Sequence, residues 1–464
     1  MILSFPTNAK HIELGKFFLT GAIIALLSLV ALRAAANEVA YTEHCFGVAF
    51  RETPYADIKC AGRVRPEGVG EAKHFELDYD NDGRLTEVRY VQNGELRPYS
   101  GRFVRAAKTK ISYSDGIELR TYFDKNGHRT VVSGDVYETR IKLALNGDRA
   151  LLAFHDVDGR PTENDFHIAV YEWAPQSDGS IIETRRRLDG TVQRNRPGFG
   201  YFVTRFSYDS RGLLRLMTNL GLTGQSVTPD EAGIVSTQIR YDQRNRFTQW
   251  TNLSATGLPQ RGMSGIAEIR YIPSRFGGEQ VASFFDADGS PQMTRWGAHK
   301  VEYEFDEYGN ETLRIFHGND GATINASNGV GRIITRWNEN GAYRKSRTYY
   351  DKLGARIGIT TAAIHEYRTD FDSAGRPSRT GSYSLTGELV DDPGTGFAID
   401  ETKFDDHGRA IERRFLDQDG ALADHAEWGV ARFVYSFSDS DELTSVKAFT
   451  KSGAVAKPSW NPSH

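Results

Sequence analysis

The sequence is poor in cysteine, with two among 464 residues. Two thiolates cannot supply a four-cysteine zinc site, and they cannot build the dense disulfide framework of a small secreted domain. The chain also lacks an excess of charge of one sign, because 57 basic and 61 acidic side chains leave a formal net charge of −4. This balance excludes a sequence-wide attraction to nucleic acid and disfavours an anionic membrane surface as partner.

Motifs of common catalytic sites are missing as well. The sequence contains no P-loop, no HExxH and no GxSxG, which carry phosphate binding, zinc hydrolysis and serine nucleophiles. The 12 histidines are scattered, and His128, His317 and His407 fall in expected turns, where solvated polar residues are usual. We therefore assign no catalytic residue and no cofactor, and expect a protein that is not an enzyme.

The first 36 residues are typical of an export signal. Lys10 and Lys16 precede an uncharged apolar run at residues 17–32 (FFLTGAIIALLSLVAL), and Arg33 and three alanines follow. As a helix the run spans about 24 Å, less than the roughly 30 Å of a bilayer core. Residues 1–36 are thus expected to be a cleaved signal peptide or, alternatively, an uncleaved N-terminal membrane anchor. Both place the body in the periplasm or outside the cell, and an anchor would tether it to the inner membrane through residues 17–32.

Residues 37–74 are expected to form an N-terminal cap that contains both cysteines. In an oxidising compartment Cys45 and Cys60 are most simply a disulfide that closes a short loop. The alternative is a reactive thiol, with the adjacent His44 as its base.

Glycine recurs with a period of about 32 to 33 residues over residues 75–457, followed by a tail at 458–464, and a fixed period of this length indicates a repeat fold. One series of turn positions is Gly83, Gly116, Gly147, Gly179, Gly212, Asn245, Gly277, Gly309, Gly341, Gly375, Gly408 and Asp441. A second series follows it at Gly94, Gly127, Gly159, Gly190, Gly224, Gly257, Gly289, Gly321, Gly354, Gly387, Gly420 and Gly453. Glycine fills 22 of these 24 positions, so each series predicts a regular turn.

The residues before the first series alternate as in a strand with one buried face. Phe75, Leu77 and Tyr79 are apolar, whereas Glu76 and Asp78 between them are expected to be solvated. The turns that follow read, for example, YDNDGR at 79–84 and FDSAGR at 371–376. In such a turn the aspartate can cap the backbone, and glycine can take the positive φ that closes a hairpin.

Twelve hairpins give about 24 strands, more than a flat open sheet usually holds. Because neighbouring strands twist by roughly 20°, we expect an all-β fold: about twelve antiparallel hairpin repeats in a spiralling, curled sheet. Short return loops, several with another glycine such as Gly297 or Gly329, connect the hairpins. A six-bladed β-propeller is the alternative, because two hairpins per blade fit the same count.

The recurring Y/F-D-x-x-G-R/N turn resembles the YD repeats of RHS-type exported bacterial proteins. The resemblance covers most of residues 75–457 and is carried by turns such as 79–84 and 371–376. It implies a spiralling β-sheet that serves as an exported scaffold or binding surface, and it transfers no catalytic residue. The period here is longer by roughly a return loop, and the residues after Gly453 are too few for an enclosed toxin domain.

Calcium is the one metal that a local motif suggests. Asp78, Asp80, Asp82 and Gly83 match the opening of an EF-hand loop. The position of the bidentate acid is Arg89, and strands flank the loop, so a hairpin turn is the main interpretation and a partial cation site the alternative.

The sequence favours an exported, non-catalytic repeat protein that binds a protein or a glycan of the cell envelope, since repeat arrays present long surfaces. Two alternatives remain open. One is an exported carbohydrate-active enzyme with a carboxylate pair assembled from distant turns, which leaves no sequence signature. The other is a surface adhesin stiffened by calcium.

Overall fold

The computed structural model describes residues 39–99, 105–196, 199–438 and 443–456. Its 28 strands form one antiparallel sheet, and the short 3-10 turn η1 (Pro66–Gly68) is the one helical element among these residues. The strands are β1 (Tyr41–Val48), β2 (Cys60–Val64), β3 (His74–Tyr79), β4 (Leu85–Gln92), β5 (Glu95–Leu96), β6 (Lys108–Ser114), β7 (Ile117–Phe123), β8 (Glu138–Leu143), β9 (Arg149–His155), β10 (Val170–Pro175), β11 (Ile181–Arg186), β12 (Val203–Tyr208), β13 (Leu214–Asn219), β14 (Ser236–Tyr241), β15 (Phe247–Leu253), β16 (Glu268–Pro273), β17 (Glu279–Phe285), β18 (Lys300–Phe305), β19 (Glu311–His317), β20 (Arg332–Trp337), β21 (Arg344–Tyr350), β22 (Ile364–Phe371), β23 (Pro377–Ser384), β24 (Ile399–Phe404), β25 (Ala410–Leu416), β26 (Arg432–Phe437), β27 (Leu443–Phe449) and β28 (Val455–Ala456).

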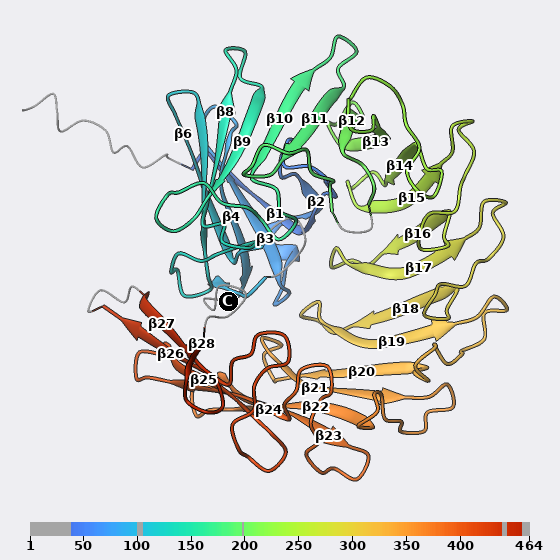
Figure 1. Cartoon of the computed structure of the whole chain (residues 1–464). Coiled ribbons are helices and arrows are strands. Elements are labelled where there is room, and N and C mark those ends of the chain that lie inside the picture. The colour runs from blue at the N-terminus through green and yellow to red at the C-terminus, as the bar shows by residue number, and fades with distance from the viewer. Residues whose placement is uncertain (1–38, 100–104, 197–198, 439–442, 457–464) are drawn as a thin grey trace, which may run out of the picture.

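The expected curled array of hairpins is confirmed. Strands pair with their neighbours in chain order, from the hairpin β3–β4 through to β26–β27, and each hairpin also bonds to the next, as β17 does to β18. Figure 1 shows the hairpins following one another around a ring. The six-bladed propeller is wrong, because backbone pairing runs without interruption from β2 to β28 and never separates into blades.

The two periodic glycine series mark the turns, as predicted. The glycines of both series have positive φ, and Asn245, which stands in a glycine position, has φ of 61°. In the turn after β14, Asp242 Oδ1 accepts hydrogen bonds from the backbone N–H groups of Arg244 and Arg246, at 2.8 and 2.9 Å. Arg246 Nε closes the same turn by donating to Asp242 Oδ2 at 2.7 Å. The turn at Asp441 lies outside the described residues.

The arginine of this turn motif also connects one repeat to the next. The Arg376 guanidinium lies 4.5 Å from the ring centre of Phe404, and Arg409 lies 4.9 Å from that of Phe437, one repeat further along in each case. A cation over an aromatic face is attractive. The Y/F-D-x-x-G-R pattern therefore combines a turn cap with a contact between repeats.

The hydrophobic core is spread along the ribbon in separate clusters. In one of them Val301 and Phe316 on strands β18 and β19 pack against Ala298, Ala326 and Val330 of the return loops. The return loops thus cover one face of the sheet, and this cluster joins neighbouring repeats, as in other repeat proteins. Other clusters also include residues of the N-terminal part of the chain, as where Ala49 and Ala61 pack against Leu213.

Residues 41–73, here called the N-terminal segment, lie inside the ring (Figure 1). They contact the tight turns of hairpins far along the chain, through Arg149 Nη1 to Tyr55 O (2.6 Å), Lys59 Nζ to Arg211 O (2.7 Å), Gly62 N to Arg244 O (2.8 Å) and Lys73 Nζ to Asn310 Oδ1 (2.6 Å). One continuous segment therefore contacts the third, fifth, sixth and eighth hairpins, and of these four the fifth and sixth alone pair with each other directly, through β13 and β14.

Two expectations about exposure are wrong. Asp78 is buried rather than solvated, because Thr42 of β1 and Arg89 of β4 both bind its carboxylate. His317 lies at the end of β19 and is buried, where its Nε2 is 3.0 Å from Glu302 Oε2.

The expected signal peptide or anchor at residues 1–36, with its apolar run 17–32, lies outside the described residues, as does the tail at 458–464. Within the described part of the chain, no helix is both long and apolar enough to cross a membrane.

Candidate functional site

The two cysteines form the expected disulfide. Cys45 on β1 and Cys60 on β2 are bonded, with their Cα atoms 5.5 Å apart, and both are buried. The reactive-thiol alternative is therefore wrong, because neither sulfur is free. The bond joins the edge strand β2 to β1 at the start of the N-terminal segment.

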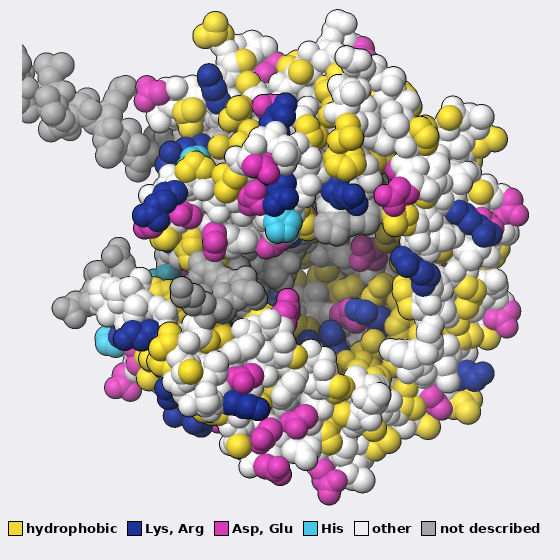
Figure 2. All heavy atoms as spheres, viewed as in Figure 1, with side chains coloured by type: hydrophobic (Ala, Val, Ile, Leu, Met, Phe, Trp, Pro, Cys, Tyr) yellow, Lys and Arg dark blue, Asp and Glu magenta, His cyan; other side chains and the backbone are white. Residues whose placement is uncertain are grey.

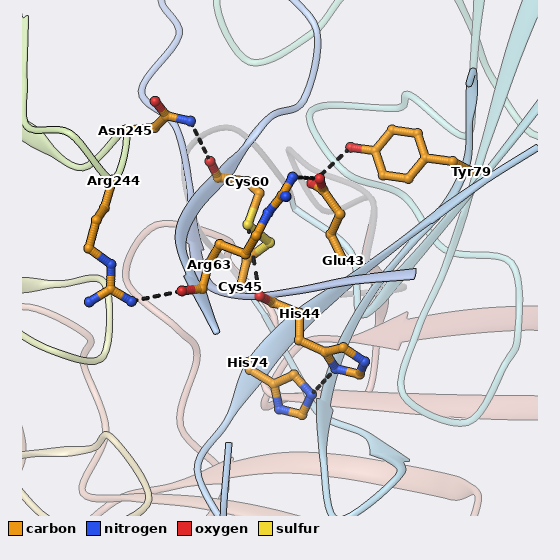
Figure 3. Close-up of a disulfide and its surroundings, with 9 residues drawn as sticks. All are labelled: Glu43, His44, Cys45, Cys60, Arg63, His74, Tyr79, Arg244 and Asn245. Atoms are coloured by element: carbon orange, nitrogen blue, oxygen red, sulfur yellow. Dashed lines mark hydrogen bonds and ion pairs between the residues drawn. A yellow bond between two sulfur atoms is a disulfide. The ribbon is translucent and has the colours of Figure 1, made fainter. Parts of the chain in front are cut away.

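Polar contacts around the disulfide connect β2 to the sixth hairpin (Figure 3). Asn245 Nδ2 donates to Cys60 O at 3.1 Å, and Arg244 Nη2 donates to Arg63 O at 2.7 Å. On the other side Arg63 pairs with Glu43, which also accepts a hydrogen bond from the Tyr79 hydroxyl at 3.3 Å. The disulfide region thus connects β2 directly to the turn after β14 and, through Glu43 of β1, to Tyr79 of β3.

The candidate calcium residues are paired with arginines. Asp78 Oδ2 is 2.8 Å from Arg89 Nη2, and Arg84 Nη2 lies 2.8 Å from a carboxylate oxygen of both Asp80 and Asp82. Asp80 Oδ1 caps the turn by accepting from the backbone of Asp82 and Arg84. The three carboxylates do not converge on a common point as ligand groups do. The calcium site stays a prediction, which titration of CaCl₂ into chelator-treated protein tests.

A cleft of about 700 Å³ lies between the N-terminal segment and the turns of the first three hairpins. Its lining includes Tyr55 and Lys59 of the segment, Tyr79 before the first turn, Tyr113 before the second and Arg149 after the third. Figure 2 shows the molecule hollowed at its centre, with charged and hydrophobic side chains facing the hollow. Tyrosines beside charged groups suit a ligand that has both apolar faces and hydroxyl groups.

An ion-pair network lines part of this cleft. Glu118 Oε1 accepts from Arg120 Nε at 2.7 Å, and Glu118 Oε2 accepts from Arg149 Nε at 2.9 Å. Arg149 Nη1 also lies 2.9 Å from Asp57 Oδ1. Burial by itself raises the pKa of the Glu118 carboxyl, but the charges of Arg120 and Arg149 outweigh it and lower the pKa. Glu118 is therefore an ionised acceptor.

The tyrosines of the cleft are held in place and stay neutral. Burial raises the pKa of Tyr79 and of Tyr113 to about 12 in each case. The Tyr79 ring stacks on Tyr41 with centroids 4.7 Å apart, and the Tyr113 hydroxyl donates to Leu85 O at 3.1 Å. Fixed, neutral aromatic side chains lose little conformational freedom when a ligand binds.

Sequence reasoning did not predict this cleft. Tyr55 and Arg149 are separated by 94 positions in the chain, and no pattern in the sequence indicates that the N-terminal segment crosses the turns. The glycine series does predict where Gly83, Gly116 and Gly147, which line the cleft, make their turns.

The chain matches no known protein family and no curated protein. Among solved structures it is similar to TcdB2-TccC3-TEV, with 11% identity over 83% of this chain and 22% of that one and a TM-score of 0.33. It is also similar to TcdB2-TccC3 (12% identity, 89% and 30% coverage, TM-score 0.21) and to the Photorhabdus luminescens Tc holotoxin pore (12%, 82% and 26%, TM-score 0.20). The chain spans less than a third of the length of each of these structures. The resemblance to YD repeats rests on the turn motif and on the array of hairpins that it builds.

Proposed function

We propose that this protein is an exported, non-catalytic binding protein of the cell envelope, and that the cleft beside the N-terminal segment takes a glycan. The observation that carries the proposal is the cleft itself: about 700 Å³, lined by tyrosine rings and by paired arginine and carboxylate groups. Sugars present apolar ring faces and many hydroxyl groups, which such a lining matches.

The electrostatics favour binding over glycoside hydrolysis. A glycosidase needs one carboxylic acid with a raised pKa beside an ionised carboxylate. In the described part of the chain, every carboxyl group with a shifted pKa has it shifted downward. Glu118 in the cleft, held between two arginines, is one of them.

Two observations support the proposal that the protein is exported. The disulfide between Cys45 and Cys60 requires an oxidising compartment, and residues 17–32 have the composition of an export signal. Cell fractionation with N-terminal sequencing of the isolated protein tests this. Recovery in the cytoplasm with both cysteines reduced would contradict it.

A blocking variant tests the glycan site. Ser114 is exposed and lines the cleft, so Ser114→Trp places a bulky ring in it without removing a buried side chain. Ser112→Trp is the matched control, because Ser112 is exposed two residues earlier on the same strand and is not among the lining residues. We expect wild type and S112W to retain a peptidoglycan fragment, lipopolysaccharide glycan or capsular polysaccharide on an array, and S114W to lose it. Equal retention by both variants, or retention of none of these glycans by wild type, would overturn the proposal.

A further inference from the structure

A cluster of two histidines and a glutamate lies on the first strands of the sheet, outside the cleft. His44 Nδ1 is 3.4 Å from His74 Nε2 and 3.7 Å from Glu76 Oε1, and His74 Nε2 is 3.6 Å from the same oxygen. Figure 3 shows the two imidazole rings turned toward one another below the disulfide. From this geometry we propose that His44, His74 and Glu76 bind one Zn²⁺ ion.

The strand register brings these side chains to one face. His44 of β1 stands directly opposite Glu76 of β3, and His74 precedes Glu76 by two residues, so all three side chains point the same way. The opposite face carries Cys45 and Phe75, which pack in the hydrophobic core. The β1–β3 pair packs on this core, and the disulfide ties β1 to β2 on its other side, so the ligands stand on a rigid support.

The three ligand atoms are spaced as a zinc ion requires. The point equidistant from them lies about 2.1 Å from each, which matches Zn–N and Zn–O bonds of about 2.0 to 2.2 Å. Two imidazole nitrogens and one carboxylate oxygen are typical zinc ligands, with a fourth position left for water. Calcium and magnesium prefer ligand sets made of oxygen.

Groups behind the ligands orient them for this role. His74 Nδ1 lies 3.1 Å from Ala72 O, so its N–H donates to that carbonyl and the lone pair of Nε2 faces the cluster. Arg89 Nη2 lies 3.1 Å from Glu76 Oε2, which leaves Oε1 for the ion. The Nδ1 and Nε2 atoms that face each other can share one proton at most, whereas a cation satisfies both lone pairs.

An ion can reach the cluster, because the side chains of His44 and Glu76 are 18% and 17% exposed, while that of His74 is 7% exposed. Bound zinc would join β1 to β3 next to the disulfide, where the N-terminal segment begins. Because it would bind the folded state, zinc should raise the melting temperature.

Calorimetry with ZnCl₂ on the EDTA-treated, dialysed protein tests the proposal. We expect one equivalent of zinc to bind, with affinity at least tenfold weaker in His44→Gln and Glu76→Gln. His317→Gln is the matched control, because His317 contacts Glu302 at 3.0 Å but, within the described residues, joins no group of three ligands. This variant should bind zinc as wild type does.

A second measurement uses the wild-type protein alone, so it tests the proposal even if the variants fail to fold. CoCl₂ added to the stripped wild-type protein should give the visible absorption of tetrahedral cobalt, and ZnCl₂ should abolish it. Absence of this spectrum, wild-type affinity no tighter than that of E76Q, or equal weakening in H317Q would each overturn the proposal.

Discussion

Gly277 provides a direct probe of how the N-terminal segment docks on the array. This residue lies in the turn between β16 and β17 with φ of +86°, and a Cβ added to it would meet Phe46 O at 2.5 Å and Phe46 C at 2.8 Å. Both are backbone atoms of the N-terminal segment, so Gly277→Ala must push the segment away from the turn. The edge-on contact of Phe46 with Phe276, at 5.6 Å between ring centres, would be disturbed with it.

Gly289, one turn later in the same repeat, separates this clash from backbone strain. Its φ is +80°, and a Cβ there would meet nothing within 4 Å. Alanine at a positive φ costs about 1 to 2 kcal/mol at either position. Forcing an atom into a packed contact costs a further amount of about 1 to 3 kcal/mol. Gly277→Ala should therefore be less stable than Gly289→Ala by about 1 to 3 kcal/mol.

Urea denaturation followed by tryptophan fluorescence measures the difference. Limited proteolysis adds a local readout, because a displaced segment should be cut between residues 46 and 63 faster in G277A than in G289A. Equal stability and equal cleavage in the two variants would refute the docking of the N-terminal segment on the seventh hairpin.

Three further changes probe the disulfide, the turn motif and a contact between repeats. Replacing both Cys45 and Cys60 by serine should lower the free energy of unfolding by about 3 kcal/mol, since the bond closes a loop with a separation of 15 residues; an unchanged urea midpoint would contradict this. Arg376→Gln removes both the cation over the Phe404 ring and the ion pair with Asp372, and should cost about 1 kcal/mol by the same assay; no loss would show that the two contacts together contribute nothing. The hydrogen bond from Arg261 of the preceding repeat lowers the pKa of Asp286 to about 2. The stability that depends on this lowered pKa is present above about pH 4 and is lost as the pH falls toward 2. In Asp286→Asn the melting temperature should therefore fall less between pH 4 and pH 2 than in wild type. An equal fall in both proteins would contradict this.

Local features of the fold could be predicted from the sequence because they depend on neighbouring residues. Positive φ at a turn favours glycine or asparagine, so Gly277 and Asn245 mark their turns without tertiary information. The alternation of Phe75, Leu77 and Tyr79 likewise indicates the strand that β3 forms. Repetition then predicts the array, since each unit pairs with the next.

Long-range features could not be predicted in this way. The cluster of His44, His74 and Glu76 exists only through the register of β1 on β3, and residues 30 positions apart give no pattern that fixes a register. The sequence does place His74 and Glu76 two residues apart, and therefore on one face of the expected strand. That alternation predicted only that the face is solvated, and it did not indicate that His44 lies opposite Glu76. Burial of Asp78 likewise depends on the strands on either side of it.

The cleft and the contacts of the N-terminal segment all require one continuous sheet that curls around this segment, and small-angle X-ray scattering of the purified protein tests the curling directly. Twenty-eight strands spaced at about 4.8 Å would extend for about 130 Å as a flat ribbon. The structure predicts the scattering of a compact ring, with a pair-distance distribution dominated by distances well below that length. A rod-like distribution that extends to about 130 Å would contradict it.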